Sequence, residues 1–161
     1  MPKITLVLHN IRSTHNVGSI LRSAEGFGVK EIIFSGYSPY PRLANDSRLP
    51  HIIDKLSNQI HKTALGAESI VPFRFIEDIG SWLTAQSSPI VALEQATSST
   101  PLDKYRPPKE LILLLGEEVN GIPQEILRLA NEIVEIPMSG QKESFNVSVA
   151  AAIALYAMNY Q

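Results

Sequence analysis

The chain alternates between short apolar runs and longer segments in which apolar residues recur every three or four positions. Six of the short runs are mostly apolar throughout, which is typical of strands that are buried on both faces of a parallel sheet. The predicted strands are residues 4–9, 31–34, 69–73, 90–93, 111–115 and 133–136.

Five segments between these strands have the periodicity of helices, namely residues 16–27, 52–65, 77–85, 123–131 and 146–159. This alternation predicts an α/β fold with a parallel sheet, organised as a single domain over residues 1–161. Two proline-rich segments, residues 37–50 and 97–108, are expected to be surface loops.

The first predicted helix has one apolar face. At about 100° per residue, its apolar side chains fall on an arc of roughly 120°, whereas Arg22 projects from the opposite side with Gly18 and Glu25. Arg22 is therefore not expected in the core, and taken alone it is an ordinary solvent-exposed arginine. Asn16 lies at the start of this helix, where an asparagine is often a simple N-cap.

The last predicted helix contains ten consecutive apolar residues, 149–158, of which five are alanine. A helix that is apolar all round, yet too short to cross a bilayer, is expected to be buried on every side. Just before it, Ser144 or Asn146 can cap the helix, whose free N–H groups would then face a ligand. An ordinary central helix would explain the alanines equally well.

The segment after residue 115 connects a predicted buried strand to a helix. Ligands of open α/β sheets bind at the carboxyl ends of strands, where this loop is expected. Gly116 and Gly121 permit close backbone approach or a sharp turn. Glu117 and Glu118 are adjacent carboxylates, but in a loop they can equally point to different places, so an acid/base pair is one of two interpretations.

Composition narrows the function classes. The 161 residues are 44% hydrophobic and include no cysteine, which excludes disulfides and thiolate metal sites. No signal peptide or membrane-spanning run is recognisable, so we expect a cytoplasmic protein that is not associated with a membrane. Dinucleotide, Walker, zinc-protease and nucleophile-elbow motifs are missing, and the scattered histidines predict no metal site.

The charge is distributed unevenly, although the net charge is only −2. Residues 1–65 hold eight Lys/Arg and four Asp/Glu, whereas the remainder holds six and twelve. A basic surface neutralises phosphates and thereby drives nucleic-acid binding. The candidates for such a surface, which can also be ordinary solvated side chains, are Lys3, Arg12, Arg42, Arg48, Lys55 and Lys62.

Three blocks in order carry a more specific signal. They read NVGSILR at residues 16–22, LGEEVNGIP at 115–123, and IPM at 136–138 followed by SFNVSVAA at 144–151. With these blocks the chain resembles, from about Leu6 to Tyr156, the SpoU-TrmH family of SPOUT RNA ribose methyltransferases. The resemblance implies a SPOUT-type α/β fold with a C-terminal trefoil knot, a homodimer, S-adenosylmethionine as methyl donor and an RNA ribose 2′-hydroxyl as acceptor.

The resemblance also implies site residues. Arg22 corresponds to the catalytic arginine of the family, which acts in the site of the other subunit, and further catalytic positions are Asn16, Glu118, Ser144 and Asn146. Arg22 is expected to position a substrate phosphate and to assist removal of the 2′-proton. Because the pKa of arginine exceeds about 12, it is a poor base, so a role as the base and a role in positioning the phosphate alone both stay open. The cofactor is expected to be held, largely through backbone groups, around Leu93, Glu94, Gly116, Ile136, Phe145 and Asn146.

The RNA substrate is less well defined. Family members that act on ribosomal RNA often carry an additional domain ahead of the methyltransferase domain, and here the first predicted strand begins at Ile4. We therefore expect tRNA rather than ribosomal RNA as the substrate. The alternatives are a ribosomal RNA 2′-O-methyltransferase and a non-catalytic RNA-binding module with the same fold.

Overall fold

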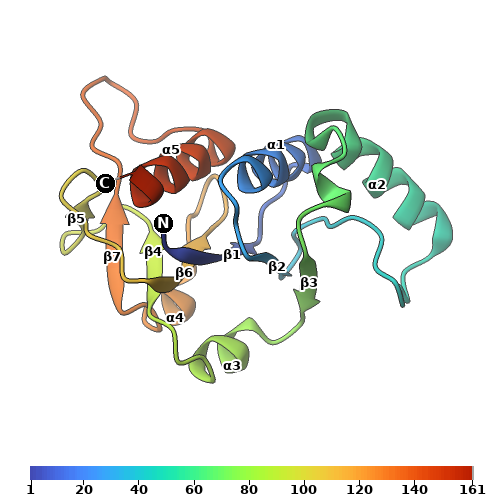
Figure 1. The fold of residues 1–161 in the computed structure, drawn as a ribbon, viewed down its shortest axis with the longest axis horizontal. Coiled ribbons are helices and arrows are strands. Elements are labelled where there is room, and N and C mark those ends of the chain that lie inside the picture. Colours follow the sequence, from blue (N-terminus) through green and yellow to red (C-terminus); the bar gives the residue numbers. More distant parts are fainter. Residues whose placement is uncertain (161) are drawn as a thin grey trace.

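A sheet of seven parallel strands runs through the protein, seen here in a computed structural model that describes residues 1–160 (Figure 1). The sheet order is β3-β2-β1-β6-β4-β7-β5, and all its pairings are parallel. The strands are β1 Lys3–His9, β2 Glu31–Ser35, β3 Phe73–Ile76, β4 Ile90–Leu93, β5 Thr100–Pro101, β6 Glu110–Leu115 and β7 Glu132–Glu135.

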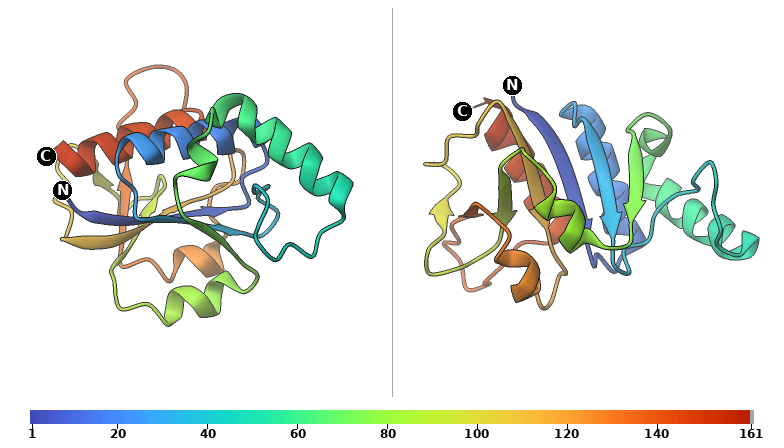
Figure 2. Two further views of the ribbon diagram at one scale, coloured as in Figure 1. Left: turned by 45° about the vertical axis from the view of Figure 1, so that its right-hand side comes forward. Right: turned by 90° about the horizontal axis from the view of Figure 1, so that it is seen from below.

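Helices cover both faces of the sheet in two layers. Three longer helices, α1 Thr14–Gly26, α2 Pro50–Ala64 and α5 Val147–Tyr160, cover one face, and α3 Ile79–Thr84 and α4 Gln124–Leu127 cover the other (Figure 2). A short 3-10 helix, η1 Ala67–Ser69, follows α2. Helix α1 lies between α2 and α5 and packs against both. The predicted parallel α/β fold is thus confirmed.

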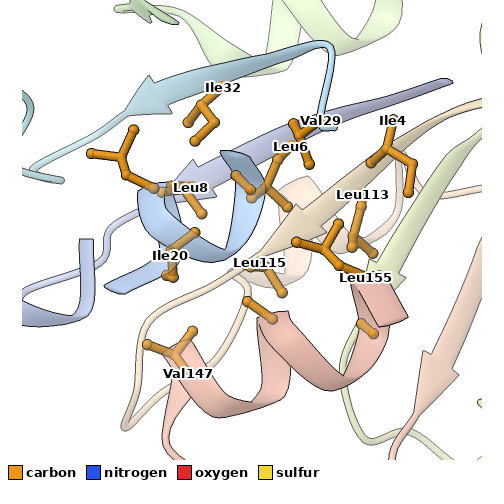
Figure 3. Packing of buried hydrophobic residues seen from close by; sticks show 14 of the residues in the cluster. Ile4, Leu6, Leu8, Ile20, Val29, Ile32, Leu113, Leu115, Val147 and Leu155 are labelled. Atoms are coloured by element: carbon orange, nitrogen blue, oxygen red, sulfur yellow. The ribbon is translucent and has the colours of Figure 1, made fainter. Parts of the chain in front are cut away.

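The central strands show why continuous apolar runs predict this sheet. Successive side chains of β1 point to opposite faces, so that Leu6 and Leu8 enter the core under α1 and α5, whereas Val7 enters the core under α3 and α4. Leu113 and Leu114 of β6 divide between the two cores in the same way. Figure 3 shows the larger core, in which Leu8 of β1 and Leu115 of β6 pack with Ile20 of α1 and Val147 of α5. Both faces of these strands must therefore be apolar.

Three predicted elements differ from the structure. The strand predicted at residues 69–73 lies later, at β3, because Pro72 has no N–H to donate and only its carbonyl joins the sheet, accepting from the Ile32 N–H at 2.9 Å. The helix predicted at residues 123–131 is the single turn α4, because Asn131 leaves the helix to bond β4 through Ile90. The loop predicted at residues 97–108 contains β5.

Gly18 was expected on the exposed side of its helix, and this expectation is wrong. Gly18 is buried where α1 crosses α2, and a Cβ atom there would lie 2.3 Å from the backbone oxygen of Ile60. Helical periodicity identifies the face toward the sheet but not this lateral contact. Arg22, by contrast, is exposed as expected.

Helix α5 is buried on one side only, contrary to the prediction from its apolar sequence. Its inner side, including Ala151, Ala154 and Leu155, is completely buried, but Val149 is 46% exposed and Tyr156 is 60% exposed. The outer side of α5 is therefore an uncovered apolar surface in the single chain. Within residues 1–160, no helix is both long and apolar enough to cross a membrane.

Candidate active site

A cavity of about 250 Å³ opens where β4, β6 and β7 end, at the carboxyl edge of the sheet. The second and third sequence blocks meet in its lining. Its walls include five of the six residues that the resemblance assigns to the cofactor, Leu93, Glu94, Gly116, Ile136 and Phe145, but not Asn146. Glu118 and Ser144 also line it. The strand-end location expected for a ligand site is therefore where the cavity lies.

The loop after β6 is a tight backbone turn that forms one wall of the cavity. Glu117 and Gly121 form an antiparallel bridge, with the Gly121 N–H donating to the Glu117 oxygen at 3.0 Å. Gly121 has φ +68°, and a Cβ atom on Gly116 would lie 2.6 Å from the Ile122 nitrogen. Both glycines are thus required by the turn itself, as their spacing suggested.

Glu94 fixes this loop to the end of β4. One of its carboxylate oxygens, Oε2, accepts from the Ile122 N–H at 2.9 Å, and the other, Oε1, accepts from the Gln95 N–H at 2.9 Å. A Cβ atom on Gly121 would lie 2.2 Å from Oε2. Glu94 therefore lines the cavity as predicted, but its carboxylate also has a structural function.

A chain of side-chain hydrogen bonds joins all three sequence blocks beside the cavity. The Asn146 Nδ2 donates to the Asn16 Oδ1 at 3.2 Å, and the Asn16 Nδ2 donates to the Glu118 Oε1 at 2.9 Å. Asn146 is also the cap of α5, since its Oδ1 accepts from the Ser148 N–H at 2.9 Å. Of the two predicted cap residues, Asn146 rather than Ser144 is the cap.

Asn16 is not an N-cap, which was the simple interpretation of its position. Ser13 caps α1 by accepting from the Asn16 N–H at 3.2 Å, and Asn16 lies in the first turn. The Asn16 side chain is consequently available for Glu118 and Asn146. Neither Asn16 nor Asn146 belongs to the cavity lining itself; both lie beside it and act on it through Glu118 and through the start of α5.

Arg12 contributes a contact that sequence reasoning missed. Its backbone N–H donates to the Glu118 Oε2 at 3.3 Å, and its guanidinium forms an ion pair with the buried Glu117. A hydrogen bond from Asn120 and the nearby Arg12 charge lower the pKa of Glu117. Arg12 and Glu118 are 106 residues apart in the chain, so no local pattern indicates their contact.

Further residues of the lining were not predicted either. Gln95 is the second residue after β4, Glu135 ends β7, and Val119 and Met138 lie in the loops beyond β6 and β7. The rule that ligands gather at strand ends could have indicated the first two residues. Val119 and Met138 depend on loop conformation, which carries no comparable signal.

Arg22 is the one predicted site residue that lies apart from the others. It is exposed on α1, and its guanidinium forms no hydrogen bond or ion pair with another residue among 1–160. The predicted residues Asn16, Glu118, Ser144 and Asn146 come together at one end of the sheet, but Arg22 does not join them within one chain.

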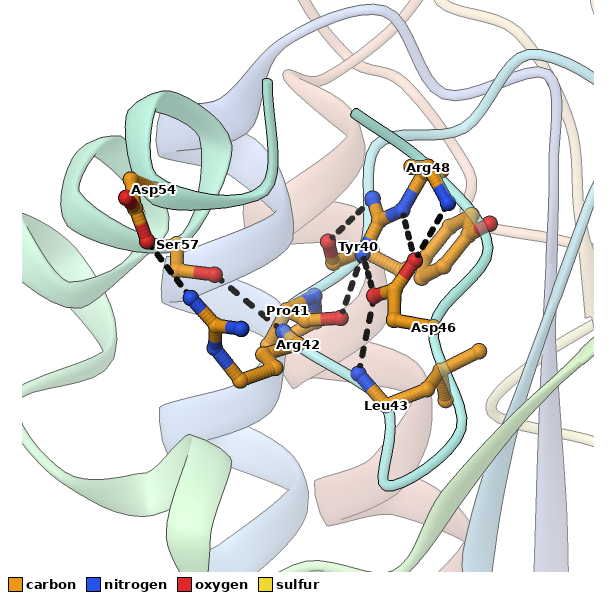
Figure 4. Close-up of polar contacts among 8 residues, drawn as sticks. All are labelled: Tyr40, Pro41, Arg42, Leu43, Asp46, Arg48, Asp54 and Ser57. Carbon is orange, nitrogen blue, oxygen red and sulfur yellow. Dashed lines mark hydrogen bonds and ion pairs between the residues drawn. The ribbon is translucent and has the colours of Figure 1, made fainter. Parts of the chain in front are cut away.

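Half of the cations of the predicted basic surface form internal ion pairs. Arg42 pairs with Asp54 at 2.5 Å, and Arg48 pairs with Asp46 at 2.5 Å. Figure 4 shows Arg48 enclosed between Asp46 and the Tyr40 ring, which lies 3.7 Å from the guanidinium carbon (Figure 4). Because Arg12 also pairs with Glu117, three of the six candidate cations hold internal partners. Lys3, Lys55 and Lys62 have no ion pair within residues 1–160.

The cavity has a strongly acidic lining. Five of the described residues around it are glutamates, and none is lysine or arginine; the glutamates are Glu94, Glu117, Glu118, Glu135 and Glu143. Such a lining favours a cationic ligand over an anionic one. The lining is also partly apolar, through Leu93, Leu115, Ile136, Phe145 and other residues.

Known proteins are similar to this chain in sequence and in fold. The chain is 31% identical over 165 residues to the 23S rRNA (guanosine-2′-O-)-methyltransferase RlmB of Nitrosomonas europaea, covering 96% of this chain and 55% of the relative. It is 30% identical over 158 residues to the tRNA (guanosine(18)-2′-O)-methyltransferase of Escherichia coli, covering 96% of this chain and 62% of the relative. The chain therefore spans less than two thirds of these relatives.

The fold resembles the AdoMet-bound rRNA methyltransferase from Sinorhizobium meliloti, with a TM-score of 0.79 at 24% identity, covering 97% of this chain and 55% of that chain. The profile of the SpoU rRNA Methylase family matches residues 3–156, nearly the full length of the chain. With the three sequence blocks joined at one cavity, the chain belongs to the SpoU rRNA Methylase family.

Proposed function

We propose that the protein binds S-adenosylmethionine in the cavity and transfers its methyl group to a ribose 2′-hydroxyl of RNA. The observation that carries the proposal is the acidic cavity at the ends of β4, β6 and β7, beside which all three blocks are joined by hydrogen bonds. Relatives of both kinds, acting on ribosomal RNA and on tRNA, are named as 2′-O-methyltransferases.

The residues of the cavity fit this cofactor. S-adenosylmethionine supplies an electrophilic methyl group on a positively charged sulfonium. A lining with five glutamates and, among the described residues, no lysine or arginine suits that charge. We expect the apolar side chains of Leu93, Ile136 and Phe145 to enclose the uncharged part. The turn at Gly116 brings the backbone close to the cavity, where its polar groups can bind a ligand directly.

Asn16, Glu118 and Asn146 are proposed to position the reacting groups. Their hydrogen bonds fix the loop after β6 relative to the start of α5, which closes two sides of the cavity. Ser144, two residues before the cap of α5, would lie against the acceptor ribose. As the acceptor oxygen bonds to the methyl group, the bond from that group to the sulfonium sulfur would break and the hydroxyl proton would pass to bulk water, assisted by Arg22 of the other subunit. Glu118 is a polar orienting group in this proposal rather than the base.

A homodimer would complete the site. The uncovered apolar side of α5 supports this part of the proposal, because burial of Val149 and Tyr156 against a second copy would remove apolar area from water. Arg22 lies exposed on the neighbouring α1, without a partner among the described residues, and would act in the site of the other subunit by positioning a substrate phosphate.

Several expectations accompany this function as parts of the proposal. The C-terminal trefoil knot stays a proposal that rests on the family resemblance alone. The single methyltransferase domain over residues 1–161 also stays a proposal, supported by the family match to residues 3–156; Gln161 lies outside the described residues. A cytoplasmic location also stays a prediction.

We propose tRNA rather than ribosomal RNA as the substrate. The relatives leave both open, since their identities to this chain, 31% and 30%, are nearly equal. Parallel assays with bulk tRNA and ribosomal RNA distinguish the two, and methylation of ribosomal RNA beside inert tRNA would overturn the preference. Activity should fall steeply between about 50 and 200 mM salt, because phosphate contacts release counterions.

The proposed cofactor is tested by calorimetric titration with S-adenosylmethionine. We expect saturable binding by the wild-type protein and at least a tenfold loss in the Gly121→Ala variant, whose new Cβ would meet Glu94 and displace the loop. Gly140→Ala is the matched control, because nothing lies within 4 Å of its Cβ position. A folded wild-type protein that does not bind the cofactor would favour a non-catalytic RNA-binding module.

A further inference from the structure

A second hollow, of about 640 Å³, lies on the other side of Arg12 from the cavity. It is formed between the loop after β2, the segment that enters α1, and one side of α2. Among its lining residues are Arg12, Tyr37, Tyr40, Lys55 and Gln59. No residue of the three sequence blocks lines it.

The hollow and the cavity have opposite charge. Three of the residues that line the hollow are basic, Arg12, Arg48 and Lys55, and no acidic residue of the described chain lines it. The cavity beside it is lined by five glutamates and, among the described residues, by no lysine or arginine. A cationic cofactor and a polyanionic substrate would therefore be attracted to adjacent but different places.

Of these three cations, Lys55 is the one available to a ligand. Arg48 is held in place, because it pairs with Asp46 and donates to the backbone oxygens of Tyr40 and Pro41 at 3.0 Å (Figure 4). Lys55 is exposed on α2 and forms no ion pair with the described residues. Arg12 can contact both the cavity wall and a ligand in the hollow, since its guanidinium pairs with Glu117 while its side chain is 59% exposed.

Tyr37 presents an aromatic ring in the same hollow. It is 54% exposed, although its backbone is firmly held by a hydrogen bond from its N–H to the Asn10 Oδ1 at 3.2 Å. The preceding Gly36 has φ +62°, and a Cβ atom there would lie 1.8 Å from the same Asn10 oxygen. An exposed ring on a rigid turn, beside a free lysine, is the arrangement with which proteins bind single-stranded nucleic acids.

Arg12 connects the hollow to the cavity. Its guanidinium contacts Glu117 and its N–H contacts Glu118, two residues of the cavity wall. A strand whose target ribose lies at Glu118 would therefore pass its neighbouring nucleotide across Arg12 into the hollow. No part of this path requires movement of the Arg48 and Asp46 pair.

We propose that the hollow binds the nucleotide adjacent to the methylated one, as single-stranded RNA, with its base stacked on Tyr37 and its phosphate at Lys55. The inference rests on the proposed function, since it assigns a place to the flanking part of the same substrate. It also accounts for an exposed aromatic ring and for a lysine that forms no ion pair with the described residues.

The proposal is tested by measuring the RNA affinity of the whole chain, in its solution state, by fluorescence anisotropy. We expect Tyr37→Ala to weaken binding of a short single-stranded RNA about tenfold, while Tyr37→Phe, which keeps the ring, binds as the wild type does. Lys55→Gln should lower the slope of log affinity against log salt by about 1. The control Lys104→Gln, exposed beyond β5 at the opposite edge of the sheet, should change neither quantity.

Calorimetry with S-adenosylmethionine separates this inference from the proposed function. Both Tyr37→Ala and Lys55→Gln should keep the wild-type cofactor affinity within twofold, because neither residue lines the cavity. Unchanged RNA affinity in both variants would overturn the inference, as would a wild-type protein that binds no RNA or that prefers duplex RNA. A wild-type protein that binds RNA through Tyr37 but binds no cofactor would overturn the proposed function alone.

Discussion

The Asn16 Nδ2 donates a hydrogen bond to the Glu118 Oε1 at 2.9 Å, although the two residues are 102 positions apart in the chain. Asn16 belongs to the first turn of α1 and Glu118 to the loop after β6. Their contact is possible because β1 and β6 are neighbours in the sheet, so that both connections emerge at the same edge. The bond ties the helix that carries Arg22 to the wall of the cavity.

Replacing Asn16 with alanine should impair methyl transfer more than stability. The variant loses bonds to Glu118 and Asn146, which releases the loop, and a small misplacement near reacting atoms can cost about 100-fold in rate. Stability should fall by only about 1 kcal/mol, since Asn16 is half-buried. Single-turnover rates and urea unfolding measure the two effects. Asn58→Ala, exposed on α2, is the control, and equal rates in both variants would contradict the positioning role.

Arg22→Ala should abolish methyl transfer while cofactor affinity stays within a few-fold of the wild-type value. The reason is that Arg22 projects from α1 away from the core and makes no contact with the cavity of its own chain among residues 1–160. Calorimetry and a labelled-methyl assay give the two quantities. Glu25→Ala changes a charge on the same exposed side and should leave both near wild type. If Arg22→Ala unfolds or loses the cofactor first, Arg22 is structural.

Tyr156→Glu should convert a dimer into monomers. Tyr156 is 60% exposed on the uncovered side of α5, and a buried, unpaired carboxylate there would oppose association. Light scattering at micromolar concentration measures the mass. Ile70→Glu places the same charge at a 66% exposed apolar residue outside α5 and should leave the mass unchanged. A wild-type protein with the mass of one chain would contradict the dimer.

Replacing two glycines of α1 with alanine should change the free energy of unfolding in opposite directions. Gly18→Ala places a Cβ 2.3 Å from the Ile60 oxygen, so α1 and α2 must separate, at a cost of about 1 to 3 kcal/mol in the free energy of unfolding. Gly26→Ala meets nothing within 4 Å and should be neutral or stabilising by up to about 1 kcal/mol. Urea unfolding of both variants measures the difference. Equal effects would mean that the close helix crossing is not required.

The Asp46 and Arg48 pair predicts a pH dependence of stability. Hydrogen bonds from Arg48 hold the pKa of Asp46 well below its usual value near 3.8. A carboxylate whose pKa is lowered by folding stabilises the folded state. This stabilisation is complete above the pKa of the unfolded state and is lost as the pH falls through the pKa of the folded state. Asp46→Asn should therefore cost about 2 kcal/mol at about pH 7, and the difference from wild type should narrow toward about pH 2.5.

Asp54→Asn provides the control for this experiment. Asp54 pairs with Arg42, but both side chains are exposed, so the substitution should change the free energy of unfolding by less than about 1 kcal/mol. If Asp46→Asn differs from wild type by the same amount at both pH values, the carboxylate charge is not what stabilises the loop.

The strands other than β3 and β5, and the location of the cavity, could be predicted from the sequence because both depend on local patterns. Continuous apolar runs indicate strands that are buried on two faces, and the ends of such strands indicate where a ligand binds. The helix boundaries were less predictable because distant partners decide them. Asn131 leaves the predicted helix in order to bond Ile90 on β4, and nothing around residue 131 indicates this contact.

The connections within the site could not be predicted for a related reason. Asn16, Glu118 and Asn146 each stand in a recognisable block, but their mutual hydrogen bonds depend on the strand order of the sheet. Arg12 belongs to no block, and its pairing with Glu117 results from the same order. The basic surface was overestimated because a sequence shows the cations but not the internal carboxylates that pair with Arg42 and Arg48.

The central claim is methyl transfer from a cofactor in the acidic cavity to a ribose oxygen of RNA. Its most direct test is to incubate the protein with methyl-labelled S-adenosylmethionine and unmodified RNA, digest the RNA to nucleosides and locate the label by mass spectrometry. Our account predicts the label on the ribose of a 2′-O-methylated nucleoside, with none produced by Arg22→Ala. A label found only on a base, or no label in either tRNA or ribosomal RNA from a folded protein that binds the cofactor, would contradict it.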